Sequence, residues 1–220
     1  MNIIVVGSKA QAELIKGKVT GDHTLLFSGF LSESHLEKAD VIFDFSIEEN
    51  PEALEQYVNY PEKAIFLNAV TFSLAEQAVY QTKVECKLFG FNGHPTFIER
   101  NLLEVSMFNE DEKIYLEKLM NDLGLAIEVV DDRVGMVTPR IIAMIINEAF
   151  YTVMEGTATK EDIDLGMKLG TNYPMGPFEW AAKWGINNVY EVLDALFEDT
   201  KDERYKICPL LKKEYLKGMV

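Results

Sequence analysis

The feature that most constrains the fold is a change of hydrophobic pattern near residue 133. Before it, short runs of β-branched and aromatic residues alternate with segments of helical spacing. After it, helical patterns follow one another with almost no strand pattern. Strands that alternate with helices predict a mainly parallel, doubly wound sheet. We therefore expect an α/β domain over residues 1–133 and an all-α domain over residues 134–220.

The pattern also predicts where the individual elements lie. We expect strands at residues 3–6, 23–28, 41–46, 64–70, 86–92, 102–108 and 125–130. We expect helices at residues 10–18, 51–60, 74–81 and 111–123, and then at 139–156, 160–170, 176–184, 188–197 and 210–216. The segment 139–156 is apolar on nearly every side, which is typical of a core helix or an oligomer interface.

The first expected strand ends at Gly7, where a nucleotide-binding α/β domain places its phosphate loop. A dinucleotide loop has the pattern G-x-G-x-x-G, but this segment reads G-S-K-A-Q-A. Gly7 matches the first glycine, which permits the tight turn. Lys9 stands at the second glycine and Ala12 at the third. The Lys9 charge can contact a phosphate, but its Cβ obstructs the close approach of the backbone.

Composition narrows the classes of partner. The net charge of −15 and the pI near 4.6 argue against a nucleic-acid partner, because phosphate backbones need clustered Lys and Arg. The two cysteines, Cys86 and Cys208, read as reduced thiols of a cytoplasmic protein. The three histidines show no metal-ligand spacing, so we expect no metal. We also expect no signal peptide and no membrane helix, since no stretch approaches about 20 apolar residues.

The second half resembles a known family over about 50 residues. N-E-A at residues 147–149, E-G at 155–156, E-D-I-D at 161–164, M-K-L-G at 167–170 and P-M-G-P-F-E at 174–179 follow in order and spacing. This segment is similar to the C-terminal domain of the 3-hydroxyacyl-CoA dehydrogenases. The resemblance implies a shortened Rossmann-like domain followed by a helical dimerisation domain. It also implies NAD as cofactor, an acyl-CoA-type substrate and a homodimer.

In this family a histidine takes the hydroxyl proton, and a glutamate at the end of a K-L-V-E-V strand orients the imidazole. The segment N-L-L-E-V places Glu104 on that glutamate. The family histidine lies twelve residues earlier, in H-F-F-N-P, and here that position is Asn92. A second alignment uses F-G-F-N-G, which puts Phe89 on the histidine and Asn92 on the motif's asparagine. His94 is the imidazole nearest in sequence, and it becomes the substitute base if the local register shifts.

Other family positions have also changed. The asparagine at the start of the family's G-F-I-V-N-R-L-L helix is Pro139 here, while Arg140 is retained. In the segment that corresponds to S-N-T-S-S, Asn68 is kept and a serine has become Val70. The long CoA-binding excursion is reduced to residues 29–40, and the glycine-aromatic tail of the family is absent.

The candidate site residues follow from these matches. Catalytic roles are expected for Glu104, His94 and Asn92, and cofactor contacts for Gly7, Ser8, Lys9, Ser46 and Asn68. One hypothesis is an NAD-dependent oxidoreductase that acts on a 3-hydroxyacyl thioester or a related hydroxy acid. The other is a non-catalytic or ligand-sensing dimeric relative, because the base, the asparagine, the serine and two cofactor glycines have changed together.

Overall fold

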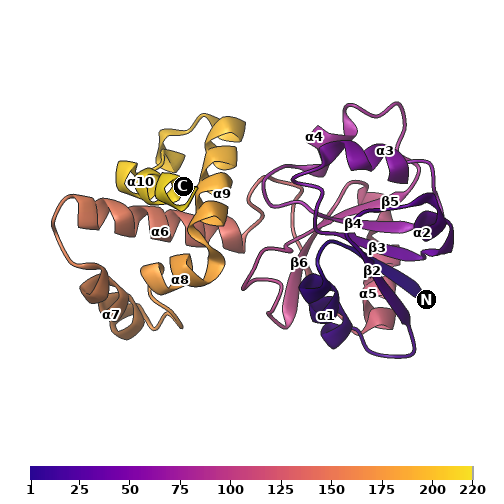
Figure 1. Ribbon diagram of the computed structural model, residues 1–220, viewed down its shortest axis with the longest axis horizontal. Coiled ribbons are helices and arrows are strands. Elements are labelled where there is room, and N and C mark those ends of the chain that lie inside the picture. Colours follow the sequence, from indigo (N-terminus) through magenta and orange to yellow (C-terminus); the bar gives the residue numbers. More distant parts are fainter. Residues whose placement is uncertain (220) are drawn as a thin grey trace. The chain divides into compact units, whose positions relative to one another are not determined.

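The computed structural model describes residues 1–219 and divides the chain into two compact units (Figure 1). Unit 1 comprises residues 1–93 and 97–136, and unit 2 comprises residues 94–96 and those from 137 onward. This division differs from the boundary predicted at residue 133 in two places. Residues 134–136 group with unit 1, where the Gly135 amide donates a hydrogen bond to the Val70 carbonyl (2.7 Å). Residues 94–96 group with unit 2, where the His94 ring is hydrogen-bonded to the indole of Trp184.

In the described part of the chain, unit 1 is built on one seven-stranded sheet with the order β2-β1-β3-β4-β5-β6-β7. The strands are β1 (Asn2–Val6), β2 (Thr24–Ser28), β3 (Val41–Asp44), β4 (Ala64–Asn68), β5 (Lys87–Phe91), β6 (Leu102–Met107) and β7 (Ala126–Val129). Neighbouring strands run parallel in every pair except β5 and β6, which are antiparallel. The predicted doubly wound, mainly parallel sheet is confirmed.

Helices cover both faces of this sheet (Figure 1). One face carries α1 (Lys9–Lys18) and α5 (Lys113–Leu123), and the other carries α2 (Glu33–Lys38), α3 (Leu54–Tyr57) and α4 (Leu74–Ala78). Side chains of a strand alternate between its two faces, so one strand serves both cores. In β1, for example, Ile3 and Val5 pack in the first core, and Ile4 and Val6 pack in the second.

Two local predictions for unit 1 need correction. The helix expected at 51–60 is a 3₁₀ turn, η1 (Pro51–Ala53), followed by the short α3. The segment 33–38, which was not expected to be helical, forms α2. A single apolar residue of α2, Leu36, packs into the core, and this explains why the segment has no helical hydrophobic pattern. A further 3₁₀ turn, η2 (Glu110–Glu112), leads into α5.

Unit 2 is helical throughout its described residues. Its elements are α6 (Thr138–Met154), α7 (Lys160–Thr171), α8 (Pro177–Trp184), α9 (Ile186–Thr200), the 3₁₀ turn η3 (Glu203–Tyr205) and α10 (Pro209–Gly218). The long helix α6 is central, since it contacts α7, α8, α9 and α10. Ile142, Ile146 and Phe150 on α6 are buried, whereas Ile141 and Met154 are exposed. Among residues 1–219, no helix combines the length and the apolar character that crossing a bilayer requires.

Candidate active site

The carboxyl ends of β1, β3, β4 and β5 lie along one edge of the sheet, because these strands are parallel. Open α/β sheets bind their ligands at this edge. Five of the predicted site residues lie here, directly at or after a strand end: Gly7, Ser8, Ser46, Asn68 and Asn92. Glu104 reaches the same region from β6, which runs antiparallel to β5.

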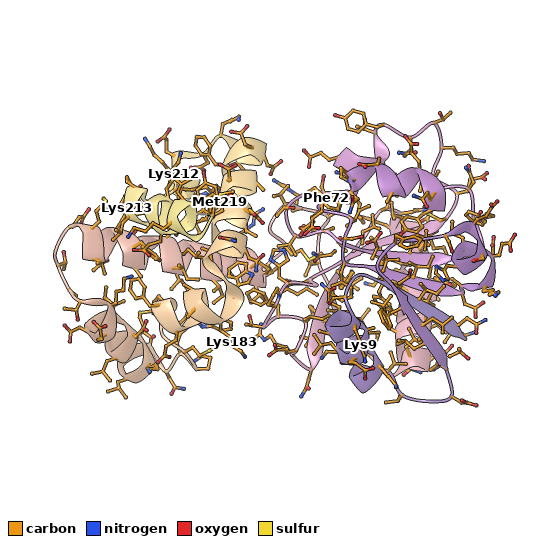
Figure 2. The ribbon with its side chains drawn as sticks, in the orientation of Figure 1. Lys9, Phe72, Lys183, Lys212, Lys213 and Met219 are labelled. Atoms are coloured by element: carbon orange, nitrogen blue, oxygen red, sulfur yellow. The ribbon has the colours of Figure 1, made fainter. Side chains whose placement is uncertain are left out.

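The turn after β1 has the conformation that its glycine permits. Gly7 has a φ of +147°, in a region that residues with a Cβ rarely adopt, and its amide donates to the Ser28 carbonyl (2.9 Å). Ser8 then caps α1. Lys9 is the first residue of the helix, and its side chain is exposed. Figure 2 labels Lys9 at α1.

Gln11 closes the start of α1 with a capping box. Its carboxamide Oε1 accepts from the Ser8 amide (2.7 Å) and the Ser8 hydroxyl (2.9 Å), and the Gln11 amide donates to Ser8 Oγ (3.3 Å). The carboxamide thus occupies the place at a helix N-terminus where an anion binds. Gln11 is not among the predicted site residues, although the S-x-x-Q pattern of residues 8–11 is typical of such a cap.

Ser46 contacts a buried carboxylate. Its amide (2.7 Å) and its hydroxyl (2.8 Å) both donate to Asp44 Oδ1, and the Tyr57 hydroxyl donates to Asp44 Oδ2 (2.6 Å). Burial, followed by the negative charge of Asp44, raises the pKa of Tyr57, so the phenol keeps its proton. All three residues line a cavity of about 270 Å³ at the ends of β1 and β3.

Asn68 belongs to a network that the sequence did not reveal. Its Nδ2 donates to Glu48 Oε2 (2.9 Å), and its Oδ1 accepts from the Gly93 amide (2.9 Å). Glu48 Oε1 accepts from the amide (2.9 Å) and the hydroxyl (2.8 Å) of Thr71. Glu48 therefore links the loops that follow β3, β4 and β5. Both polar atoms of the Asn68 amide are occupied within the chain.

Asn92 and Glu104 face each other across β5 and β6. The Asn92 amide donates to the Glu104 carbonyl (3.1 Å), and Asn92 Nδ2 lies 3.5 Å from Glu104 Oε2. The antiparallel pairing of β5 with β6 produces this arrangement. The spacing of twelve residues therefore brings an amide and a carboxylate together. A carboxamide does not accept a proton near neutral pH, so Asn92 does not act as a general base.

His94 belongs to unit 2. Its ring is buried, and its Nδ1 accepts a hydrogen bond from Trp184 Nε1 (3.1 Å), because an indole N–H can only donate. The neutral ring then carries its proton on Nε2. Thr96, in the same short segment, has a φ of +70° and a buried hydroxyl. Among the described residues, no group of three His, Cys, Asp or Glu side chains has the geometry to hold a metal ion.

Comparison with known proteins identifies the family of unit 2. Residues 135–219 match the family model described as 3-hydroxyacyl-CoA dehydrogenase, C-terminal domain. A 3-hydroxyadipyl-CoA dehydrogenase of Escherichia coli is 40% identical over 93 residues, which cover 42% of this chain and 20% of the relative. A probable 3-hydroxybutyryl-CoA dehydrogenase of Bacillus subtilis is 38% identical over 110 residues, which cover 50% of this chain and 38% of the relative. Residues 135–219 therefore match the C-terminal domain of the 3-hydroxyacyl-CoA dehydrogenases.

Solved structures extend the likeness in fold to nearly the whole chain. The (S)-3-hydroxybutyryl-CoA dehydrogenase of Ralstonia eutropha superposes with a TM-score of 0.76 and 21% identity, over 99% of this chain and 94% of that one. FadB2 of Mycobacterium tuberculosis superposes with a TM-score of 0.79 and 18% identity over 99% of this chain and 93% of that one. Unit 1 thus shares its fold with these two solved structures, while the matches to the two curated relatives span only 20% and 38% of their lengths.

NAD is the cofactor that the sequence resemblance implies, and its pyrophosphate would lie at the start of α1. The turn at Gly7 and the N-terminus of α1 suit a pyrophosphate oxygen, provided that the Gln11 carboxamide moves away. That movement is possible because Gln11 is a flexible side chain that is not fully buried. Lys9 adds positive charge beside this position but also a Cβ where the dinucleotide loop has a glycine. The turn and the helix therefore fit a dinucleotide phosphate at the cost of one capping interaction.

Proposed function

We propose that this chain is a 3-hydroxyacyl-CoA dehydrogenase-type oxidoreductase that acts on a 3-hydroxyacyl thioester or a related hydroxy acid. The observation that carries the proposal is the pair formed by Asn92 and Glu104 at the carboxyl edge of the sheet. In this pair, Glu104 stands at the position of the family glutamate, and Asn92 stands at the position of the family histidine, twelve residues earlier. The match of residues 135–219 to the C-terminal domain of the 3-hydroxyacyl-CoA dehydrogenases supports the same reaction class.

The proposed roles follow the chemistry of each group. Glu104 orients its neighbours through its negative charge, and Asn92 binds the ligand through its carboxamide. His94 is the proposed proton acceptor. In the structure, the Trp184 N–H donates to Nδ1 of the His94 ring, so this nitrogen is engaged within unit 2. A missing general base costs about 10²–10⁴ in rate.

NAD is the proposed cofactor. Gly7, Ser8 and Lys9 would hold its pyrophosphate, and Ser46 and Asn68 would lie beside its nicotinamide half. When bound, NAD supplies the hydride acceptor of the reaction. The residues of the chain would bind and orient the cofactor and the substrate. The Ser46 hydroxyl already donates its hydrogen bond to Asp44, so toward the cofactor it could only accept.

Turnover in three proteins tests the proposal. NADH oxidation by acetoacetyl-CoA is followed in the wild type, in Glu104→Ala and in Asn92→His. We expect slow turnover in the wild type and none in Glu104→Ala. We expect Asn92→His to be faster by about 10²–10⁴, because an imidazole then faces Glu104. If all three proteins, including Asn92→His, fail to oxidise NADH, the proposed activity is wrong.

A second candidate is a non-catalytic or ligand-sensing relative, which the Gln11 capping box favours because it occupies the pyrophosphate position. Calorimetric titration with NAD⁺ and NADH separates the two candidates. Heat of binding below millimolar cofactor supports the oxidoreductase. Absence of binding at millimolar cofactor, together with binding of 3-hydroxybutyryl-CoA, supports the sensor.

We further propose that the chain is a homodimer, and that it acts in the cytoplasm in fatty acid metabolism. Apolar side chains on α6 and α7 support the dimer: Ile141 and Leu165 are about half exposed, and Leu169 is 78% exposed. Beside them, a groove of about 680 Å³ is lined by residues of α6, α7 and η3. We propose neither a nucleic-acid nor a membrane partner, in keeping with the net charge of −15.

A further inference from the structure

The orientation of the Asn92 carboxamide is fixed by its neighbour. Glu104 presents a carboxylate, which can only accept hydrogen bonds when it is ionised. The donor end of the amide, Nδ2, therefore turns toward Glu104 Oε2, and the acceptor end, Oδ1, points the other way. Asn92 is only 3% exposed, and the β5–β6 pairing holds its backbone in place.

Asn92 Oδ1 is buried and has no hydrogen-bond partner among residues 1–219. Buried polar atoms almost always have a partner, so an acceptor like this one calls for a donor from outside the chain. Asn92 lies at the carboxyl end of β5, on the edge where such sheets bind ligands.

Asn68, the other buried asparagine on this edge, shows the contrast. Its Oδ1 accepts from the Gly93 amide and its Nδ2 donates to Glu48, so each of its two polar atoms already has a partner within the chain. Asn92 instead presents a buried carboxamide oxygen to which no donor of residues 1–219 is bonded, and the carboxylate of Glu104 sets the orientation of this amide.

We propose that Asn92 Oδ1 accepts a hydrogen bond from the 3-hydroxyl of the bound ligand, so that the chain selects the 3-hydroxyacyl form over the 3-oxoacyl form. The proposal rests on the proposed function for its substrate class. A hydroxyl can donate to Oδ1, whereas a ketone oxygen brings only lone pairs and leaves Oδ1 unsatisfied. Glu104 acts as a positioning residue that keeps the acceptor end toward the ligand.

Direct binding without cofactor tests the proposal, because no turnover can then occur. Calorimetry compares 3-hydroxybutyryl-CoA with acetoacetyl-CoA for the wild-type chain. We expect the hydroxy ligand to bind about 10- to 100-fold more tightly, since an unpartnered buried acceptor carries a penalty of this order. A ratio near one, or a preference for acetoacetyl-CoA, overturns the selectivity but leaves the substrate class intact. Failure of both ligands to bind overturns the selectivity and the substrate class together.

Variants test the role of each side chain. In Glu104→Gln, the new amide can donate to Asn92, so the Asn92 amide can turn over and the ratio should fall to near one. Asn92→Leu removes the acceptor and should also abolish the preference. Asn101→Leu makes the same chemical change at an exposed position and should keep the wild-type ratio. An unchanged ratio in both Asn92→Leu and Glu104→Gln, with circular dichroism showing a folded protein, overturns the proposal.

Discussion

Cys86 shows how burial controls the chemistry of one residue. Its side chain is packed against the apolar core that α2, α3 and α4 form with the sheet. Burial, and then the negative charge of Glu112, raise the pKa of the Cys86 thiol from 9.0 to about 12. The thiol therefore stays protonated and inert across the ordinary pH range, and Cys86 is a free cysteine in the structure.

We predict that Cys86 lowers the stability of the chain as the pH rises above about 9. In the unfolded chain the thiol ionises near its ordinary pKa of 9.0, while in the folded chain it keeps its proton until about pH 12. The folded state then binds more protons, so the free energy of unfolding falls with pH. Urea denaturation of the wild type and of Cys86→Ala from pH 7 to 10.5 measures the effect. The stability difference between the two proteins should change steadily above pH 9, in favour of the variant; a constant difference contradicts the prediction.

Single residues of the site were predictable only where their partners are near in sequence. The Gln11 cap follows from the pattern of residues 8–11 and could have been found. The role of Glu48 could not, because its donors lie 20 to 23 residues away, at the end of β4 and in the loop after it. Likewise, His94 joins unit 2 through Trp184, which is 90 residues distant. The family resemblance placed Asn92 twelve residues before Glu104, at the position of the family histidine, but the contact between the two side chains and the orientation of the amide are visible only in the structure.

At the scale of elements, buried strands were the most predictable because they are short continuous apolar runs. The strands were generally shorter than expected, since residues at their carboxyl ends turn away to build the edge of the sheet. Ser46 and Asn92, for example, were placed inside strands but follow β3 and β5. Short helices such as α2 and α3 were less predictable, because tertiary contacts rather than their own pattern stabilise them.

The junction of α7 and α8 shows how two family motifs work together. Asp164 of α7 accepts from the amides of Phe178 (2.8 Å) and Glu179 (3.2 Å) at the start of α8. Gly176 precedes α8 and has no side chain to cap it. A Cβ on Gly176 would come within 2.4 Å of the Asp164 carboxyl carbon. The E-D-I-D and P-M-G-P-F-E segments are thus held together by hydrogen bonds.

We predict opposite effects of the same substitution at two glycines of unit 2. Gly176→Ala pushes Asp164 away from α8 and should lower the free energy of unfolding by about 2 kcal/mol, as two capping hydrogen bonds are lost. Gly166→Ala lies in α7 with nothing within 4 Å of the new methyl group. It should raise the free energy of unfolding by about 0.5–1 kcal/mol, because alanine favours the helix. Urea denaturation followed by circular dichroism measures both; equal effects at the two positions contradict the prediction.

For the molecule as a whole, the excess of acidic residues acts against the proposed homodimer. The net charge of −15 opposes association at low ionic strength, while the exposed apolar side chains of α6 and α7 favour it. Salt screens charges beyond about 8 Å at physiological ionic strength, so apolar contact can then dominate.

We therefore predict a dimer of twice the 25.0 kDa chain mass that becomes tighter with added salt. Light scattering after size exclusion measures the mass at several salt and protein concentrations. Leu169→Glu places a charge on the exposed apolar face and should shift the protein toward monomer. Ile114→Glu makes a similar change at an exposed position of α5 in unit 1 and should leave the dimer intact. A wild-type monomer at micromolar concentration refutes the dimer.

The capping box at α1 places the Gln11 side chain where the phosphate of the proposed cofactor would bind. The Gln11 carboxamide and the phosphate of the proposed cofactor would compete for the same Ser8 donors, so only molecules whose cap is open would receive the phosphate. The apparent affinity is then the intrinsic affinity reduced by the fraction of open molecules. Shortening Gln11 to alanine would loosen the helix and sharpen phosphate binding at once. The Gln11 side chain therefore stabilises the start of α1 and, by the same contacts, lowers the affinity of the loop for a phosphate.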